Sequence, residues 1–218
     1  MTGFSFPFRG DDDEDEDELI ESYKLWSDDP EHFLTGQVLV AMPQMGDPRF
    51  EHSVIYVCAH NASGAMGLIL NKEHDSVTLI DMFEQLDIQP NTNLLPSNQR
   101  NAVMTGGPVE TSRGFVLHSL DYSHESTVQI TNDIGLTASI DIVTAISDGT
   151  GPKNYVIALC CSAWGAGQLE DEFNENSWLN VSADDHLLFD IDRRTLWKTA
   201  IAKLGVDPGL LHATVGNA

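Results

Sequence analysis

The chain has 218 residues, 41% of them hydrophobic, and its 34 acidic and 11 basic residues give a formal net charge of −23. This length and composition suit one domain with a sizeable core that needs neither disulfides nor metal to fold. Proteins hold nucleic acid mainly by neutralising phosphates with Lys and Arg, so direct DNA binding is disfavoured, and so is binding to an anionic membrane.

The first 31 residues form a distinct acidic segment. They hold 12 acidic and 2 basic residues, and residues 11–18 are an unbroken run of acids, DDDEDEDE. Such a run repels itself and buries nothing, so we expect residues 1–31 to be disordered. The organised domain is expected to span residues 32–218.

The first half of the domain predicts strands and one helix. Residues 34–43 end at Pro43 and read as a strand, and residues 53–60 and 65–71 read as a hairpin around a turn in NASG. Thr78 followed by Asp81 is a capping box that opens a helix.

The second half predicts three strands, a buried central strand and further helices. The strands are residues 101–107, 113–120 and 127–131, and the central strand is YVIALCC (155–161). The helices are one that Ser139 caps, that runs through Ser147 and that stops at Gly149, residues 168–176, and one that Asp192 caps and Gly205 ends. Because strands and helices do not alternate strictly, we predict an α+β domain: a twisted mixed sheet flanked by helices.

Five strings along the chain carry a family resemblance. They are GQVLVAMPQMGDPRFEHSVIYVCAH, GAMGLILNK, GGPVE, GFVLHS and WGAGQLEDEFNENSWL. Together they resemble the bacterial AlgH/YqgE family from about Leu34 to Val215. The resemblance implies a compact α/β fold with a twisted sheet, and the family is often labelled a regulator of transcription. One departure is Cys160-Cys161-Ser162-Ala163 before Trp164, where the family usually carries a glycine-containing stretch.

The segment from Trp164 to Glu170 is the main candidate for a binding site. The pattern predicts that a strand ends, that Gly165 and Gly167 follow, and that a helix then begins. Trp164 is suited to stacking on a planar ligand and Gln168 to hydrogen bonding it. The alternative is an ordinary strand–helix turn with Trp164 in the core.

Gly106, Gly107 and His118 are weaker candidates. The two glycines precede Pro108 and form either a phosphate-binding loop or a tight turn, and the GK[ST] ending of a phosphate loop is missing. His118 sits in a predicted strand as a general base or as a buried, hydrogen-bonded histidine. The histidine spacings match no metal motif, so we expect no metal and no cofactor.

The cysteines and one ion pair complete the candidates. The odd count of Cys58, Cys160 and Cys161, with apolar neighbours and no CxxC, indicates free thiols in a reducing cytoplasm. Adjacent Cys160 and Cys161 are expected on opposite faces of their strand, with raised thiol pKa values that oppose redox sensing. Asp47 and Arg49 are expected to pair across a turn.

Two functions remain open from the sequence. A non-enzymatic regulatory protein that acts through a protein partner fits the missing catalytic motif, and it predicts an exposed apolar patch. A small-molecule binder or enzyme predicts instead that Gly106, His118, Trp164 and Gln168 converge around a concavity. The first function is preferred.

Overall fold

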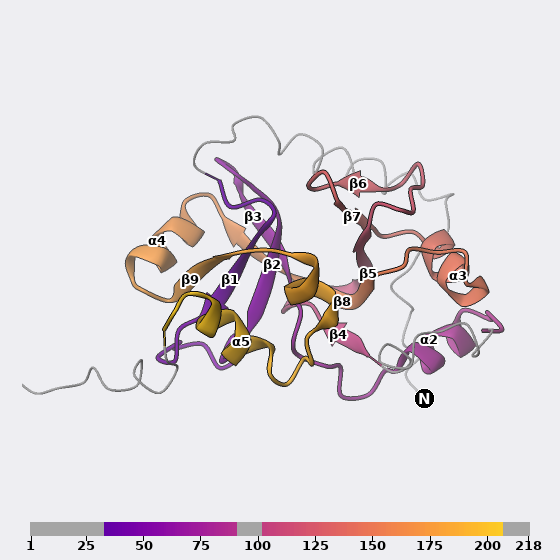
Figure 1. Ribbon diagram of the computed structural model, residues 1–218, viewed down its shortest axis with the longest axis horizontal. Helices are drawn as coiled ribbons and strands as arrows, with labels where there is room; N and C mark the ends of the chain where they lie inside the picture. Colours follow the sequence, from indigo (N-terminus) through magenta and orange to yellow (C-terminus); the bar gives the residue numbers. More distant parts are fainter. Residues whose placement is uncertain (1–32, 91–101, 207–218) are drawn as a thin grey trace, which may run out of the picture.

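A computed structural model describes residues 33–90 and 102–206. Within these ranges, nine strands form one sheet in the order β6-β7-β5-β8-β3-β2-β1-β9, and β4 pairs with β8 beside this path (Figure 1). The β4–β8 pair is parallel, and the other strand pairs are antiparallel. The predicted α+β class with a mixed sheet is therefore confirmed. The acidic segment 1–31 lies outside the described residues.

The strands and helices have the following bounds. The strands are β1 (Gln37–Ala41), β2 (Val54–Asn61), β3 (Gly64–Ile69), β4 (Val103–Thr105), β5 (Val109–Ser119), β6 (Val128–Gln129), β7 (Ile134–Thr137), β8 (Tyr155–Gly165) and β9 (Trp178–Ser182). The helices are α2 (Leu79–Gln85), α3 (Ile140–Asp148), α4 (Gln168–Asn174), the π-helical segment η2 (His186–Asp190) and α5 (Leu196–Lys203). None of the helices in the described ranges is long and apolar enough to cross a membrane.

Local capping signals were reliable in two helices and wrong in a third. Thr78 caps α2 with the full capping box to Asp81, and α3 ends at Gly149 with φ 72°, as predicted. Asp192 does not cap α5, whose N-cap is Thr195. The Asp192 carboxylate instead accepts the Arg194 N–H at 2.9 Å and closes a turn that precedes the helix.

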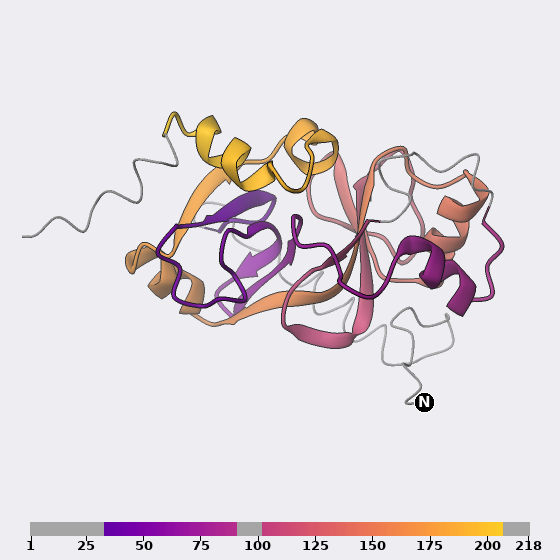
Figure 2. The same cartoon turned by 90° about the horizontal axis from the view of Figure 1, so that it is seen from below.

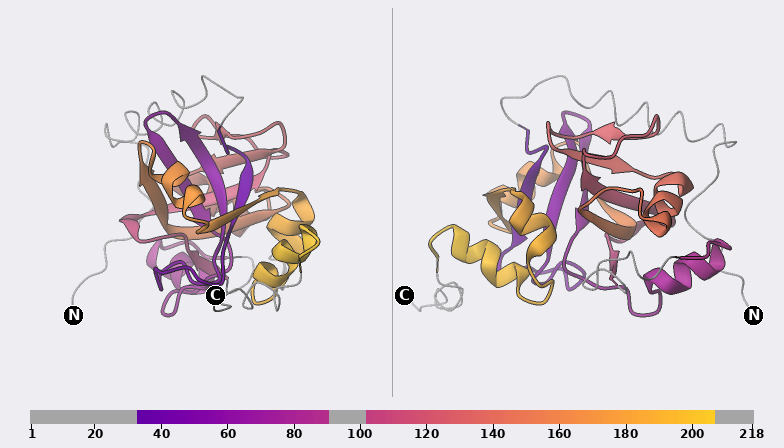
Figure 3. Two further views of the ribbon diagram at one scale, coloured as in Figure 1. Left: turned by 90° about the vertical axis from the view of Figure 1, so that its left-hand side faces the viewer. Right: turned by 45° about the vertical axis from the view of Figure 1, so that its right-hand side comes forward.

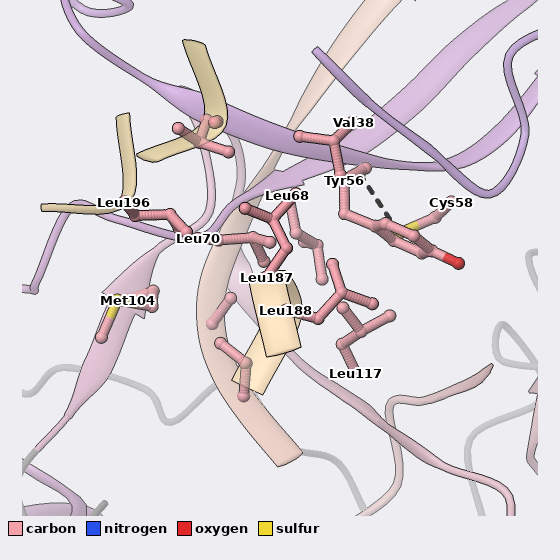
Figure 4. Packing of buried hydrophobic residues seen from close by; sticks show 14 of the residues in the cluster. Val38, Tyr56, Cys58, Leu68, Leu70, Met104, Leu117, Leu187, Leu188 and Leu196 are labelled. Carbon is pink, nitrogen blue, oxygen red and sulfur yellow. Dashed lines mark hydrogen bonds between the residues drawn. The ribbon is translucent and has the colours of Figure 1, made fainter. Parts of the chain in front are cut away.

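The main core lies between the curled sheet and the η2–α5 segment. Alternate residues of the strands point into it, and Figure 4 shows Val38, Tyr56 and Leu68 meeting Leu187 and Leu188 of η2. α5 contributes buried residues to the same cluster and packs on β1 and β2. The sheet therefore has one face closed by the C-terminal helices.

Two smaller cores cover the opposite face. α2 and α3 pack on the half formed by β5 and the first part of β8, whereas α4 packs on the half formed by β1, β2 and β3. Figures 2 and 3 show α4 at one end of the molecule and the α2–α3 pair at the other. The two ends are joined by the long strand β8.

The alternation of side chains shifts by one residue inside β8, between the parts of the strand that belong to the two halves. Its first part pairs with β5 and its last part with β3. Val156 and Ala158 face the main core, and so does Cys161, because Cys160 takes a left-handed φ of 66° that shifts the alternation by one residue. Cys160 packs on the α2–α3 side, so the two cysteines face opposite sides as expected.

Gly106 and Gly107 sit directly against this shift in β8. The Gly106 N–H donates to the Leu159 carbonyl at 2.7 Å, and the Gly106 carbonyl accepts from the Ile69 N–H at 2.9 Å and from the Ser162 hydroxyl at 3.1 Å. A β-carbon on Gly106 would overlap the Cys160 carbonyl oxygen, and one on Gly107 would overlap the Cys161 backbone. These glycines therefore form a tight, buried turn.

We predict that Gly106→Ala destabilises the fold by roughly 3 kcal/mol or more, because the backbone of β8 has no room to move away from the new methyl group. Gly46→Ala is the matched control: a β-carbon there meets nothing within 4 Å, so its effect should stay within about 0.5 kcal/mol. Urea unfolding measures both. Equal effects would contradict the close-approach role of Gly106.

Candidate functional site

A groove lies where four separate segments meet at the α4 end of the molecule. It has a volume of about 420 Å³ and is walled by the β1–β2 loop, the start of β5, the end of β8 and α4. We call it the aromatic groove. Its lining residues are Met45, Gly46, Asp47, Arg49, Phe50, Pro108, Val109, Ala163, Trp164, Gln168, Glu172, Glu175 and Ser177.

Two aromatic rings, Phe50 and Trp164, line the aromatic groove, and Trp178 packs against both. Phe50 stacks on Trp164 with ring centroids 6.4 Å apart and 23° between planes. Trp178 meets Phe50 edge-on at 5.7 Å and Trp164 edge-on at 6.1 Å. Trp164 and Trp178 are 5% and 3% exposed, so their rings also form part of the core under α4. The floor is thus rigid and largely apolar.

Glu172 holds the two indoles from the helix side. Its carboxylate accepts the Nε1–H groups of Trp164 at 2.9 Å and Trp178 at 2.7 Å, and the side-chain amide of Gln168 at 2.9 Å. The Gln168 carbonyl oxygen in turn accepts the Gly165 N–H at 3.0 Å. A carboxylate offers about four acceptor positions, so about one of them remains for a ligand.

An ion pair marks the opposite rim. The Arg49 guanidinium contacts the Asp47 carboxylate at 2.6 Å, as the sequence predicted, and lies 5.9 Å from the Phe50 ring centroid. Hydrogen bonding from Arg49 lowers the pKa of Asp47. Since this pair cancels its own charge, Glu172 and Glu175 leave the aromatic groove with a negative balance.

A buried histidine anchors α4 to the sheet behind the aromatic groove. His60 in β2 is 3% exposed, and its Nδ1 accepts the Leu34 N–H at 3.2 Å. The proton therefore lies on Nε2, which donates to the Glu170 carboxylate at 3.0 Å. This contact ties the first turn of α4 to β2 and fixes the helix that presents Glu172.

The structure brings only some of the predicted site residues together. Trp164 and Gln168 line the aromatic groove, and Gly106 and Gly107 lie just before its Pro108. His118 pairs with Tyr155, nine residues before Trp164 on β8, a separation of roughly 30 Å along a strand. His118 therefore does not join this site.

His118 is a fully buried histidine with both ring nitrogens engaged. Its Nδ1 donates to the Ser119 carbonyl at 3.0 Å, so Nε2 accepts the Thr137 hydroxyl at 2.9 Å. Burial lowers the pKa of His118. A hydroxyl beside an imidazole resembles a nucleophile–base pair, but Thr137 is only 1% exposed and a substrate has no access to it.

Metal and thiol chemistry have little support in the part of the chain that the structure describes. No group of three His, Cys, Asp or Glu residues in residues 33–90 and 102–206 is placed to hold a metal ion. The three cysteines are free thiols, and burial raises the pKa of Cys58 and of Cys160, as the sequence predicted for the latter. A raised pKa disfavours the reactive thiolate.

Sequence reasoning missed Phe50, Glu172 and Trp178. Gln168 and Glu172 are four residues apart on α4, which places them on one helix face and was a usable signal. Phe50 and Trp178 belong to strings that carry the family resemblance, but only the folded chain shows that they meet.

We predict that Glu172→Ala destabilises the protein by about 2–4 kcal/mol, because two buried indole N–H groups lose their acceptor. Urea unfolding gives the free energy, and tryptophan emission should shift to the red. Glu175→Ala, on the exposed side of the same helix end, should change stability by no more than about 0.5 kcal/mol. If Glu172→Ala leaves the free energy of unfolding unchanged, the carboxylate does not hold the rings.

We also predict a pH dependence from His118. Its pKa is lowered in the folded protein, so the unfolded chain binds more protons just below pH 6.5, and stability falls as the pH drops through that range. The loss is at most about 1.4 kcal/mol per pH unit for one group. In urea unfolding, His118→Gln should reduce the difference in the free energy of unfolding between pH 7.5 and pH 5.5, whereas the exposed His186→Gln should not.

The comparisons with known proteins identify the family. The AlgH-like family model (DUF179) matches residues 38–209. A UPF0301 protein of Rhodospirillum rubrum is 47% identical over 188 residues, which cover 86% of this chain and 96% of the relative. A UPF0301 protein of Vibrio parahaemolyticus is 45% identical over 186 residues, covering 85% and 99%.

Solved structures agree with this match. The solution structure of the AlgH protein from Pseudomonas aeruginosa aligns with a TM-score of 0.68 and 38% identity, covering 88% of this chain and all of that one. A crystal structure from Corynebacterium diphtheriae, at 17% identity and a TM-score of 0.66, shares the fold over 86% of this chain and 96% of its own. The chain belongs to the AlgH-like family.

Proposed function

We propose that this protein is a non-enzymatic regulatory protein that binds a basic, extended segment of a protein partner in the aromatic groove. The observation that carries the proposal is the pairing of an aromatic floor with unbalanced carboxylates in one concave site. Lysine and arginine side chains match both features, because their stems lie on apolar surface while their charges meet acids or ring faces.

The chain itself offers an example of this recognition. Arg49 places its guanidinium over the Phe50 ring while a carboxylate holds its other side. A partner's basic side chain has carboxylate contacts available nearby, on the free acceptor position of Glu172 and on the exposed Glu175. Electrostatic attraction by the acidic chain would speed the encounter.

A flat apolar docking face has less support. Among the described residues, the large hydrophobic side chains that are clearly exposed are Val109, at 37%, and Leu204, at 40%. The apolar patch expected from the sequence is therefore not found in these ranges, and Val109 lies at the aromatic groove itself. This distribution favours recognition in a groove.

The proposal places regulation in the cytoplasm and through a protein partner. A formal net charge of −23 opposes a direct grip on DNA phosphates, so any effect on transcription would be indirect. The free thiols are consistent with a reducing compartment. Binding is preferred over catalysis because the His118–Thr137 pair is buried away from the aromatic groove.

Fluorescence anisotropy with a labelled nonapeptide of alternating lysine and leucine tests the proposal. We expect binding to the full chain at low salt, weakening by roughly two- to fivefold in Glu175→Gln, as expected for one exposed charge pair. Phe50→Leu, which keeps the apolar volume and removes the ring, should weaken binding by roughly tenfold.

The control separates a site from general attraction. Glu84→Gln removes the same charge from the exposed surface of α2, at the other end of the molecule (Figure 1). It should leave the affinity unchanged. If Glu84→Gln weakens binding as much as Glu175→Gln, or if the peptide with glutamate in place of lysine binds equally well, the aromatic groove is not the site.

A further inference from the structure

A second cavity lies beside the first residues of β8, whereas the aromatic groove lies at the end of this strand. It has a volume of about 440 Å³ and is bounded by β4, the first residues of β8 and the connection between η2 and α5. Met104, Ile157 and Phe189 give it an apolar wall, and Arg193 and Glu73 also line it. We call it the Arg193 cavity. Its size is typical of small-molecule sites.

Arg193 is unlike two other arginines of the domain. Arg49 and Arg194 are exposed, and each contacts an aspartate two residues earlier at 2.6 Å. Arg193 is half-buried, and its guanidinium donates one hydrogen bond, to the Leu188 carbonyl at 2.7 Å. No carboxylate of residues 33–90 or 102–206 lies within 4.0 Å of it.

This arrangement is unfavourable for the stability of the unliganded protein. Burial lowers the pKa of Arg193 to about 10, because the charged guanidinium loses contact with water. A cation that is removed from water and has no counter-ion destabilises a fold, and a methylene chain of similar size would not. A destabilising charge that lines a cavity is a signature of a binding group.

Glu73 supplies an opposite charge in the same cavity without contacting Arg193. Its negative charge acts to raise the pKa of Arg193, yet the two groups form no ion pair within 4.0 Å. A bridge between Glu73 and Met104, together with the His74 N–H bonded to the Val103 carbonyl at 2.8 Å, fixes the Glu73 backbone beside β4. One cavity thus holds two separated opposite charges, and neither Glu73 nor Arg193 forms an ion pair with another described residue.

The other acids of the cavity are already engaged. Asp192 is held by Arg194 through two side-chain hydrogen bonds, and this contact lowers the pKa of Asp192 to about 2. Asp190 lies 3.4 Å from the His186 imidazole. These carboxylates, with Glu73, would repel a ligand that carries several negative charges, so Arg193 is suited to a single carboxylate.

We propose that the Arg193 cavity binds a small zwitterion of the amino-acid class with an apolar side chain. The ligand carboxylate meets the guanidinium of Arg193, the ammonium group points toward Glu73, and the side chain lies along the apolar wall. This site is separate from the aromatic groove, and its existence does not depend on the proposed partner binding.

Calorimetry and thermal shift on the full chain with a matched set of three compounds test the proposal. Phenylalanine carries both charges, 3-phenylpropionate lacks the ammonium group, and phenethylamine lacks the carboxylate. We expect phenylalanine to bind tightest, with each partial compound roughly tenfold weaker or more. At a hundredfold excess over its dissociation constant, phenylalanine should raise Tm by roughly 5–10 °C.

Three variants assign the charges. Arg193→Met should keep or raise the Tm of the unliganded protein and abolish phenylalanine binding, and Arg193→Lys should weaken binding roughly tenfold. Glu73→Gln should bind phenylalanine no better than the wild-type protein binds 3-phenylpropionate. Lys153→Gln, which removes an exposed cation outside this cavity, should bind phenylalanine normally.

Several outcomes would overturn the proposal. They are the failure of both phenylalanine and leucine to bind the wild-type protein, equal binding of phenethylamine and phenylalanine, and unchanged affinity in Arg193→Met. Tighter binding of inorganic pyrophosphate than of phenylalanine would show a polyanion site instead. A large loss of Tm in unliganded Arg193→Met would show that Arg193 is retained for stability.

Discussion

The architecture depends on the shift of alternation in β8. β8 belongs to two half-sheets, because its first part pairs with β5 and its last part with β3, and the left-handed Cys160 shifts its alternation by one residue between them. A non-glycine residue in this conformation costs about 1–2 kcal/mol. The glycine turn at Gly106 offsets this cost, because it bonds to both neighbouring strands and fits against the bulge without a side chain.

The aromatic groove follows from the same shift. After Cys160, the side chain of Trp164 faces α4 and not the main core, so the ring meets Phe50 and the Glu172 carboxylate. Without the shift, the indole would point into the closed side of the sheet. The irregular backbone at Cys160 thus determines where the Trp164 ring lies. Backbone irregularities often contribute to binding sites in this way.

Local signals in the sequence predicted local structure well, but they did not predict features that depend on residues far apart in the chain. The capping box at Thr78 and the stop at Gly149 need only neighbouring residues, and both are present. β7, β9 and η2 were missed; in η2, three consecutive buried residues match neither the helical nor the strand period. Trp164 was expected beyond its strand, but pairing with β3 extends β8 to Gly165. The convergence of the groove residues depends on that pairing.

The two concave sites lie at opposite ends of β8, and they differ in which charged side chains are neutralised by ion pairs. At the aromatic groove, the domain leaves acids unbalanced and neutralises its own cation with Asp47. At the Arg193 cavity, the guanidinium has no ion pair with any residue that the structure describes, although the chain is rich in acids. An acidic protein has many carboxylates with which to neutralise an arginine, so the isolation of Arg193 needs a specific geometry. Because the backbone between the sites is pinned at Gly106 and Ser162, neither site can move β8 without breaking buried hydrogen bonds. Occupation of one site should therefore leave the affinity of the other nearly unchanged.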